Sequence, residues 1–224
     1  QVLTDSFFEQ HPDGTMTVLL IDDPGQGRVE IRGAEVVLLD EIGIESDLLE
    51  ELTLGYTLIE LATSVKPWLL RALLARGWGH AVYFDPDILV TSRMDELAEL
   101  ALAHSVVLTP HLTEPMPRDG HQPAEQDILL AGTFNLGFIA VGNTGAGRAM
   151  LDWWSERLIT DAFVDPGRGF FTDQRVIDLV PGLFDHLVVR DPSWNVAYWN
   201  LATRPLTRVG GEVQVHGQAL RFFH

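Results

Sequence analysis

The chain has 224 residues, of which 46% are hydrophobic, and its formal net charge is −17. This length and apolar content can fill the core of one large domain or at most two small ones. The negative charge argues against a nucleic-acid-binding surface. The sequence has no cysteine, which excludes disulfides and thiolate zinc sites. No apolar stretch approaches the roughly 20 residues of a membrane span.

The chain is predicted to open with a helix and two short strands. Apolar residues at helical spacing predict a helix that ends at residues 11–14, and strands follow at 17–21 and 36–39. Residues 22–25, which are rich in Asp, Pro and Gly, predict a turn after the first strand. The helix has no leading strand, so we expect the first strand of a doubly wound sheet to be absent from this chain.

The stretch at residues 81–90 organises the rest of the sequence. Four apolar residues before Asp85 predict a strand that is buried on both faces, and Pro86 ends or bends it. Asp85 and Asp87 should therefore lie at the carboxyl end of a strand, where open α/β sheets bind ligands. Two hard oxygen ligands in that place suit a divalent cation that bridges to phosphate. The alternative is that the two acids only cap a turn.

The remaining elements alternate between helix and strand. Helices are predicted at 46–52, 55–75, 94–103, 124–131, 144–162 and up to 179, and strands at 105–109, 133–141, 186–189, 212–216 and 219–223. Lys66-Pro67 predicts a break or a new start within the helix at 55–75. Asn135 and Gly137 interrupt the strand at 133–141, which indicates either a close ligand approach or a β-bulge. Residues 194–200 form an aromatic and amide cluster that could be core or a wall facing a sugar.

Five features occur in a recognisable order: Lys66; Phe84-Asp85-Pro86-Asp87; Asn135-Leu136-Gly137-Phe138; Asp173-Gln174; and a late His. This set resembles the nucleotide-sugar-dependent glycosyltransferases of the GT-A fold, nearest to the retaining family-8-like group and its bacterial relatives. The resemblance spans the whole chain. It implies an α/β fold with a Rossmann-like, mixed but mostly parallel sheet flanked by helices and a small C-terminal β element. We expect residues 1–224 to form a single domain of this kind, incomplete at both ends.

The resemblance also implies a metal site. Asp85 and Asp87 match the Asp-x-Asp motif, which would hold Mn²⁺ or Mg²⁺. A late His would be the third ligand. His224, which follows Phe222-Phe223, matches the bacterial relatives better than His216 does.

Other residues would serve the donor and the reacting sugar. The resemblance places Lys66, Asp85, Asn135 and Gly137 at the donor. Asp173 and Gln174 would be the catalytic pair that faces the reacting sugar. The relatives often carry an Arg two positions before the Lys, where this chain has Ser64.

The implied reaction moves a sugar from a nucleoside-diphosphate sugar, with a UDP-sugar favoured, to a hydroxyl acceptor, with retention of configuration. The acceptor would be a glycan, a lipid-linked molecule or another alcohol, and we expect Trp194, Asn195 and Asn200 to contact it. We expect a cytoplasmic location, or peripheral attachment at the inner face of the membrane.

Two other functions remain open from the sequence. An Asp-x-Asp phosphohydrolase would use Asp85 as a nucleophile, but it would want Thr or Val where this chain has Leu89. The second alternative is a non-catalytic domain that binds a sugar or a nucleotide.

Overall fold

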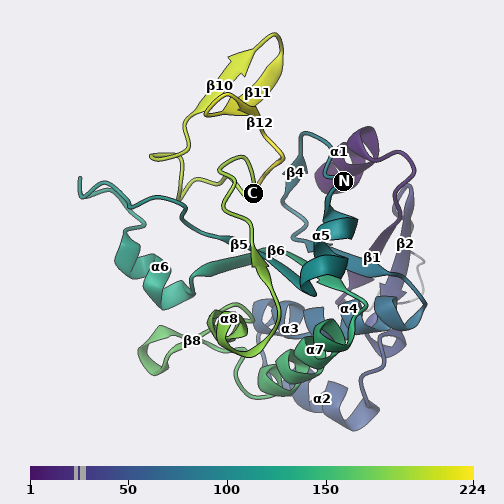
Figure 1. The fold of residues 1–224 in the computed structure, drawn as a ribbon. Helices are drawn as coiled ribbons and strands as arrows, with labels where there is room; N and C mark the ends of the chain where they lie inside the picture. Colours follow the sequence, from purple (N-terminus) through teal and green to yellow (C-terminus); the bar gives the residue numbers. More distant parts are fainter. Residues whose placement is uncertain (23–24, 26–28) are drawn as a thin grey trace.

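The computed structural model describes residues 1–22, 25 and 29–224 (Figure 1). Its largest sheet carries the strand that ends in the acidic pair. The strand order in this sheet is β3-β6-β5-β9. Its strands are β3 (His80–Phe84), β6 (Phe134–Gly142), β5 (Val106–Pro110) and β9 (Leu187–Val188). Every residue of β5 and β6 is buried, as a strand covered on both faces should be.

The sheet is mixed, as expected, but it is not mostly parallel. Strand β6 is antiparallel to both β3 and β5, and only the β5–β9 pair in this sheet is parallel. The expected predominance of parallel pairs is therefore wrong. An apolar run indicates that a strand is buried, but it does not indicate whether the neighbouring strand is parallel or antiparallel.

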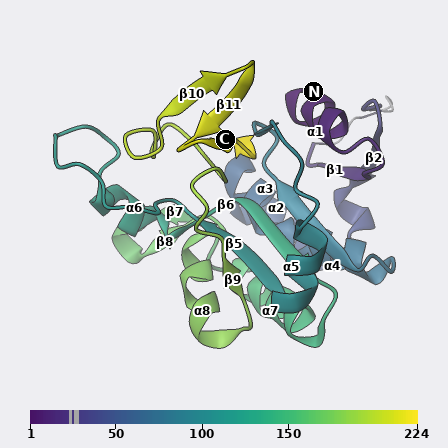
Figure 2. The same ribbon diagram turned by 45° about the horizontal axis from the view of Figure 1, so that its top comes forward.

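Helices pack on both faces of this sheet (Figure 2). On one face, Leu108 and Ile139 belong to a core with helices α4 (Lys66–Ala75) and α7 (Gly145–Leu158). On the other face, Val107 and Ala140 pack with helix α5 (Leu97–His104). The alternation follows from strand geometry, in which successive side chains point to opposite faces.

The N-terminal part forms a separate two-stranded sheet and a series of short helices. Helix α1 (Val2–Gln10) precedes β1 (Met16–Leu20), which pairs in parallel with β2 (Ala34–Leu38). Asp23 and Pro24 of the turn predicted after β1 lie outside the described residues. A short 3₁₀ helix, η1 (Leu39–Glu41), and helix α2 (Ser46–Gly55) follow β2.

The helix predicted at 55–75 is in fact two helices, α3 (Leu58–Ser64) and α4. Thr57 and Glu60 form a capping box that starts α3, because each side chain bonds to the backbone of the other residue. Pro67 lies in the first turn of α4, where its missing N–H costs no helical hydrogen bond. The break predicted at Lys66-Pro67 is therefore confirmed.

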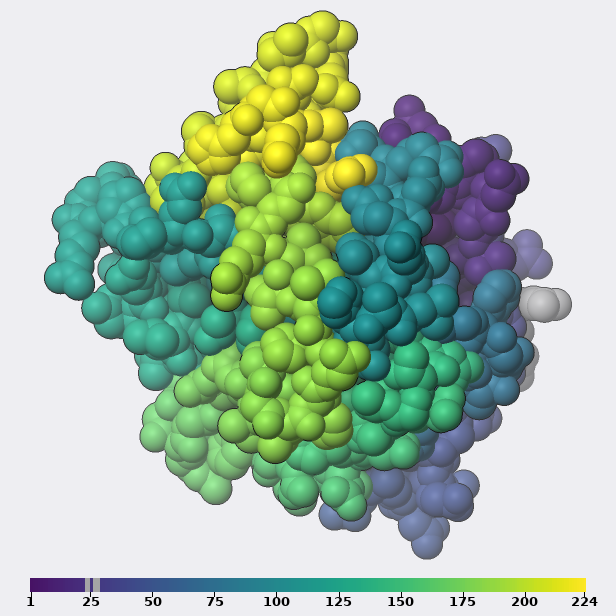
Figure 3. Space-filling model, viewed as in Figure 1, coloured from purple at the N-terminus to yellow at the C-terminus, as the bar shows by residue number. Residues whose placement is uncertain are grey.

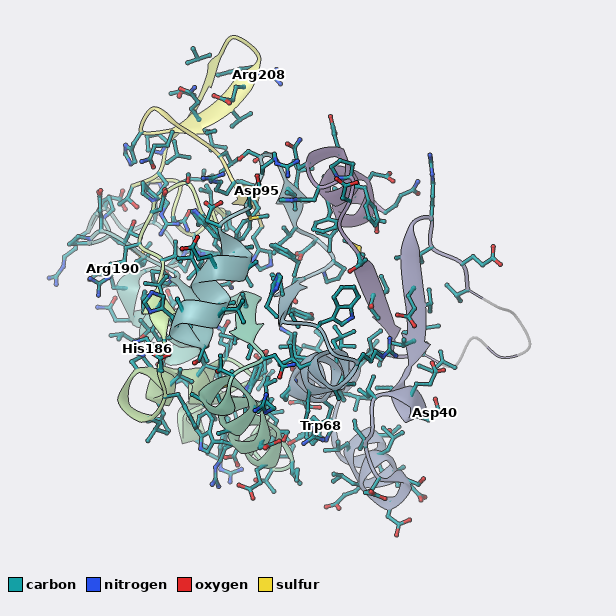
Figure 4. The ribbon with its side chains drawn as sticks, turned by 45° about the vertical axis from the view of Figure 1, so that its right-hand side comes forward. Asp40, Trp68, Asp95, His186, Arg190 and Arg208 are labelled. Carbon is teal, nitrogen blue, oxygen red and sulfur yellow. The ribbon has the colours of Figure 1, made fainter. Side chains whose placement is uncertain are left out.

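The C-terminal part contains a hairpin that projects from the rest of the chain (Figure 3). It consists of β10 (Leu206–Val209), β11 (Glu212–Val215) and β12 (Gln218–Ala219), and Arg208 on β10 is labelled in Figure 4. The strand predicted at 219–223 is divided between β12 and β13 (Phe222–Phe223). Strand β13 leaves the hairpin and pairs with β4 (Leu89–Val90), directly after the acidic pair.

The remaining elements connect these parts. They are α6 (Glu125–Ala131), β7 (Val164–Asp165), η2 (Pro166–Arg168), β8 (Phe170–Phe171), η3 (Arg175–Leu179) and α8 (Val180–Leu183). In the described part of the chain, no helix is both long enough and apolar enough to cross a membrane.

Candidate metal and donor site

The acidic pair lies where the sequence predicted it, at the carboxyl end of β3. The Asp85 N–H donates to the Gly137 carbonyl oxygen at 2.8 Å, which extends the pairing of β3 with β6 by one residue. The Ile88 N–H then donates to the Asp85 carbonyl oxygen at 3.1 Å and closes a turn around Pro86 and Asp87. The turn leaves the Asp87 side chain 74% exposed, whereas that of Asp85 is 26% exposed.

A buried lysine lies beneath Asp85. Lys66 Nζ is 3.4 Å from Asp85 Oδ1, 3.0 Å from Asp173 Oδ2 and 3.0 Å from the Leu136 carbonyl oxygen. It also lies 4.5 Å from the centre of the Tyr83 ring. Because these contacts surround the ammonium group, Lys66 acts in this structure as the counter-ion of the two carboxylates. The resemblance had implied a contact with the donor instead.

Burial and charge set the protonation of this cluster. Burial opposes the charge of Lys66, but the neighbouring Asp173 and Asp85 outweigh it, so the pKa of Lys66 lies above its usual value. Burial raises the pKa of Asp173 above its usual range, and Lys66 only partly offsets this. Burial also raises the pKa of Tyr83, so its hydroxyl keeps its proton. The hydroxyl donates a hydrogen bond to Asp85 Oδ1 at 2.8 Å.

His224 reaches the acidic pair because β13 pairs with β4. Phe222 lies opposite Val90 and Phe223 opposite Leu89, so the next residue arrives beside the turn that holds Asp87. The His224 Nε2 atom is 3.3 Å from Asp87 Oδ1 and 3.6 Å from Asp85 Oδ2.

His216 lies elsewhere. One of its ring nitrogens is 2.9 Å from the Thr203 carbonyl oxygen, near the projecting hairpin. The structure therefore brings His224, and not His216, to the predicted metal site.

Gly137 and Asn135 lie on β6 against the ring of His224. A Cβ atom at position 137 would lie 2.2 Å from His224 Cε1, so only glycine leaves room for the imidazole. The Asn135 Oδ1 atom lies 3.0 Å from His224 Nδ1. Both residues are thus at the predicted site, and the close approach that the glycine permits is that of His224.

The cluster suits a divalent cation. Asp85, Asp87 and His224 each offer a ligand atom, and these atoms lie within 4.8 Å of one another. The ammonium of Lys66 contacts Asp85 and Asp173, whereas the ion-pair partner of Asp87 is His224, so a cation would offset negative charge that Lys66 does not reach. Carboxylate oxygens with one imidazole nitrogen are a reasonable donor set for Mn²⁺.

Asp173 and Gln174 are close to this cluster, but both are buried. Asp173 is 2% exposed and Gln174 is 7% exposed. The Gln174 amide donates to the Ala131 carbonyl oxygen at 2.9 Å and accepts from the Leu136 N–H at 3.3 Å. In this structure the amide joins the end of α6 to β6, and it has no free group directed at a sugar.

The residues expected at the acceptor are in the interior. Trp194, Asn195 and Asn200 are only 3%, 1% and 1% exposed, so they present almost no surface to an acceptor, and their contact with one stays a prediction. The side-chain amides of Asn195 and Asn200 form hydrogen bonds within the protein. For example, Asn200 Nδ2 donates to the carbonyl oxygens of His111 and Asn195. An alternation of aromatic and amide residues does not reveal which of them point inward.

In the aromatic and amide cluster at residues 194–200, the one exposed residue is Tyr198. Tyr198 is 71% exposed, and its ring packs edge-on against that of Trp199. The Trp199 ring in turn packs edge-on against His224. An aromatic pair, in which Tyr198 is exposed and Trp199 is partly buried, therefore adjoins the candidate metal site.

Two contributors to the site were not predicted. Tyr83 lies two residues before Asp85 on the same face of β3, a spacing that could have indicated its hydrogen bond to Asp85. His111 lies within hydrogen-bonding distance of Asn135, with 3.3 Å between Asn135 Nδ2 and His111 Nε2. No local pattern marks His111, because it lies just beyond β5 and meets Asn135 only in the folded chain.

No protein-family model matches the chain, and no curated protein matches it. The features of this chain that point to a function are therefore its motif residues and the geometry of the site.

Proposed function

We propose that the chain is a metal-dependent glycosyltransferase that moves a sugar from a nucleoside-diphosphate sugar to a hydroxyl acceptor, with retention of configuration. The observation that carries the proposal is the meeting of Asp85 and Asp87 with His224 at the end of β3. Two of these residues form one motif, and the third comes from the far end of the sequence at the position that the resemblance implied. A UDP-sugar is the favoured donor.

Asp85, Asp87 and His224 would hold Mn²⁺ or Mg²⁺. A divalent cation held there would supply positive charge to offset the negative charge that builds on the leaving diphosphate. The chain's own contribution is to keep these ligands in place, with Tyr83 and Lys66 fixing Asp85 from below.

Retention is supported by the position of Asp173. An inverting enzyme needs a carboxylate base that reaches the acceptor hydroxyl. Asp173 is 2% exposed and paired with Lys66, so it is shielded from an incoming acceptor in this conformation. In a retaining front-face reaction the leaving phosphate helps to take the acceptor proton, and the protein mainly positions groups and stabilises charge.

The test is a thermal-shift panel of nucleoside diphosphates and UDP-sugars, with Mn²⁺ or with chelator, followed by assays of transfer to glycan and lipid-linked acceptors. We expect metal-dependent stabilisation by the nucleotide, because a ligand that binds only the native state raises its stability. We also expect a product with the anomeric configuration of the donor. A product with the opposite anomeric configuration would contradict the retaining mechanism. Nucleotide binding of equal strength with and without metal would contradict the proposed metal site.

A phosphohydrolase is the second candidate, because Asp85 lies beside Lys66 and Asp173. Such an enzyme would release phosphate from simple phosphate esters, and it would form a phosphoryl-aspartate at Asp85. Phosphate release that disappears in the Asp85→Asn variant, without sugar transfer by the unaltered chain, would favour this reading. Nucleotide binding without turnover of either kind would favour a non-catalytic domain.

A further inference from the structure

We infer that Asn135, held in place by His111, is a positioning residue that keeps the proton of His224 on Nδ1, so that the Nε2 lone pair faces a cation held by Asp85 and Asp87. This inference rests on the metal site of the proposed function, but it does not depend on sugar transfer. It also gives Asn135 a different task from the donor contact that the resemblance implies.

The orientation of the Asn135 amide is fixed by a group that can only donate. The Gly137 N–H lies 3.1 Å from Asn135 Oδ1, so this atom must be the oxygen of the amide. The Asn195 Nδ2 atom, which also donates to Thr109 Oγ1 at 2.8 Å, lies 3.0 Å from the same oxygen. Exchanging the oxygen and nitrogen of Asn135 would therefore place its NH₂ group against the N–H groups of Gly137 and Asn195.

This orientation determines the tautomer of His224. Its Nδ1 atom lies 3.0 Å from Asn135 Oδ1, and a carbonyl oxygen can only accept. The proton must therefore be on Nδ1. In the neutral ring, Nε2 is then unprotonated and directed at Asp85 Oδ2 and Asp87 Oδ1. A lone pair facing two carboxylates is unfavourable by itself and becomes favourable when a cation lies between them.

His111 holds the other end of the amide. Asn135 Nδ2 lies 3.3 Å from His111 Nε2, which must accept because the amide nitrogen donates. Burial lowers the pKa of His111 to about 4, so its ring is neutral at neutral pH and can accept through Nε2. The contacts from His111 Nε2 through the Asn135 amide to His224 Nδ1 thus agree in donor and acceptor, and they place the His111 proton on Nδ1, a buried atom with no hydrogen-bond partner among the described residues.

This arrangement follows a general feature of metal sites. A histidine that binds a metal through one ring nitrogen normally donates its other N–H to a fixed acceptor, which sets the tautomer and the ring orientation. Both groups of the Asn135 amide are already engaged by protein atoms. Asn135 would therefore act on the cation through His224, and its replacement should change metal affinity in the absence of any sugar.

The first test measures Mn²⁺ affinity by electron paramagnetic resonance of the free ion, without nucleotide. Asn135→Leu keeps the side-chain volume but removes both amide groups, and we expect about a 10- to 100-fold loss of affinity. His111→Leu removes only the acceptor behind the amide, so we expect a smaller loss. His111→Gln restores an acceptor oxygen, and its affinity should return toward that of the unaltered chain.

The second test observes the tautomer directly by long-range ¹H–¹⁵N correlation on the histidine-labelled protein without metal. At about pH 9 an ordinary imidazole is neutral, and we expect His224 to carry its proton on Nδ1. The His224→Gln variant assigns the signal. In Asn135→Leu the signal should shift toward the Nε2–H form.

An Nε2–H form in the unaltered chain would overturn the inference. Unchanged Mn²⁺ affinity in folded Asn135→Leu and His111→Leu proteins would do so as well, because a merely structural role would lower their melting temperatures and leave the affinity unchanged. If Asn135→Leu does not fold, the His111 variants and the tautomer of the unaltered chain decide the question. Failure to transfer sugar, with these results intact, would count against the proposed function alone.

Discussion

Gly137 lies directly against the imidazole of His224, so that a Cβ atom at position 137 would be 2.2 Å from His224 Cε1 and 2.7 Å from Nδ1. Non-bonded carbon atoms are most favourably separated by about 3.5 to 4.0 Å. The glycine in β6 and the last residue of the sequence therefore constrain each other. This contact connects the central sheet to the proposed metal ligand.

Replacing Gly137 with alanine should displace His224. We expect Gly137→Ala to lower Mn²⁺ affinity by at least about 10-fold, as loss of ligand positioning does elsewhere. Overpacking should also lower the free energy of unfolding by about 1 to 3 kcal/mol. Titration with Mn²⁺ and urea denaturation measure the two effects.

The control is the double variant Gly137→Ala, His224→Ala. Removing the imidazole makes room for the new methyl group, so part of the lost stability should return while Mn²⁺ binding stays weak. A Gly137→Ala protein with the affinity of the unaltered chain would show that His224 does not bind the cation.

Asp87→Ala should separate metal binding from stability. The Asp87 side chain is 74% exposed, so its removal should change the free energy of unfolding by less than about 0.5 kcal/mol. Mn²⁺-dependent stabilisation by UDP should disappear. Glu99→Ala on α5 removes another exposed acid of equal charge and should preserve that stabilisation. If both variants bind Mn²⁺ equally, the cation is held by general negative charge and not by this site.

Lys66→Met should destabilise the chain even without metal. It would leave Asp173, which is 2% exposed, without its counter-ion. Breaking a buried ion pair from one side costs about 3 to 5 kcal/mol, which urea denaturation in chelator would measure. The double variant Lys66→Met, Asp173→Asn removes both charges and should recover much of the loss. A loss as large in the double variant as in the single one would mean that Lys66 acts mainly through Asp85 and Leu136.

His111 should make the native state sensitive to acid. Burial lowers its pKa from an ordinary value of 6.5 to about 4, so the native protein binds fewer protons than the unfolded chain between these values. The stability contributed by neutral His111 is complete above about pH 6.5 and is lost as the pH falls toward 4. At about 1.4 kcal/mol per pH unit, the loss attributable to His111 is about 3 kcal/mol.

The measurement is urea denaturation between pH 7 and pH 4 for the unaltered chain and for His111→Gln. The variant cannot gain the proton, so the difference in unfolding free energy between the two proteins should shrink or reverse as the pH falls. Parallel pH profiles for the two proteins would mean that His111 titrates normally.

The local parts of the fold were predictable because their signals are local. The apolar run before Asp85, the proline after it and the Lys66-Pro67 break each act within a few residues, and the structure has a strand end or a helix start at each of them. Strand β10 was missed. All of its residues are exposed, and hydrophobic alternation does not mark a strand in a projecting hairpin.

The parts that were not predictable depend on contacts distant in sequence. The antiparallel placement of β6 between β3 and β5 is set by how the chain connections pack, and either direction would suit the same buried run. The positions of Asp85, Asp87 and His224 were predicted from a resemblance of motifs. The use of Gly137 and Asn135 to hold His224 was not, because it appears only when β13 pairs with β4.

The pairing of β13 with β4, which brings His224 to the acidic pair, also affects how the chain resists proteolysis. A cation shared by Asp85, Asp87 and His224 would join residues separated by most of the chain, much as a reversible cross-link does. Joining the ends of a long loop removes more conformational freedom from the unfolded chain than joining those of a short one. Loading the site with Mn²⁺ should therefore protect the region between β4 and the hairpin from proteases, and chelation should expose it to cleavage.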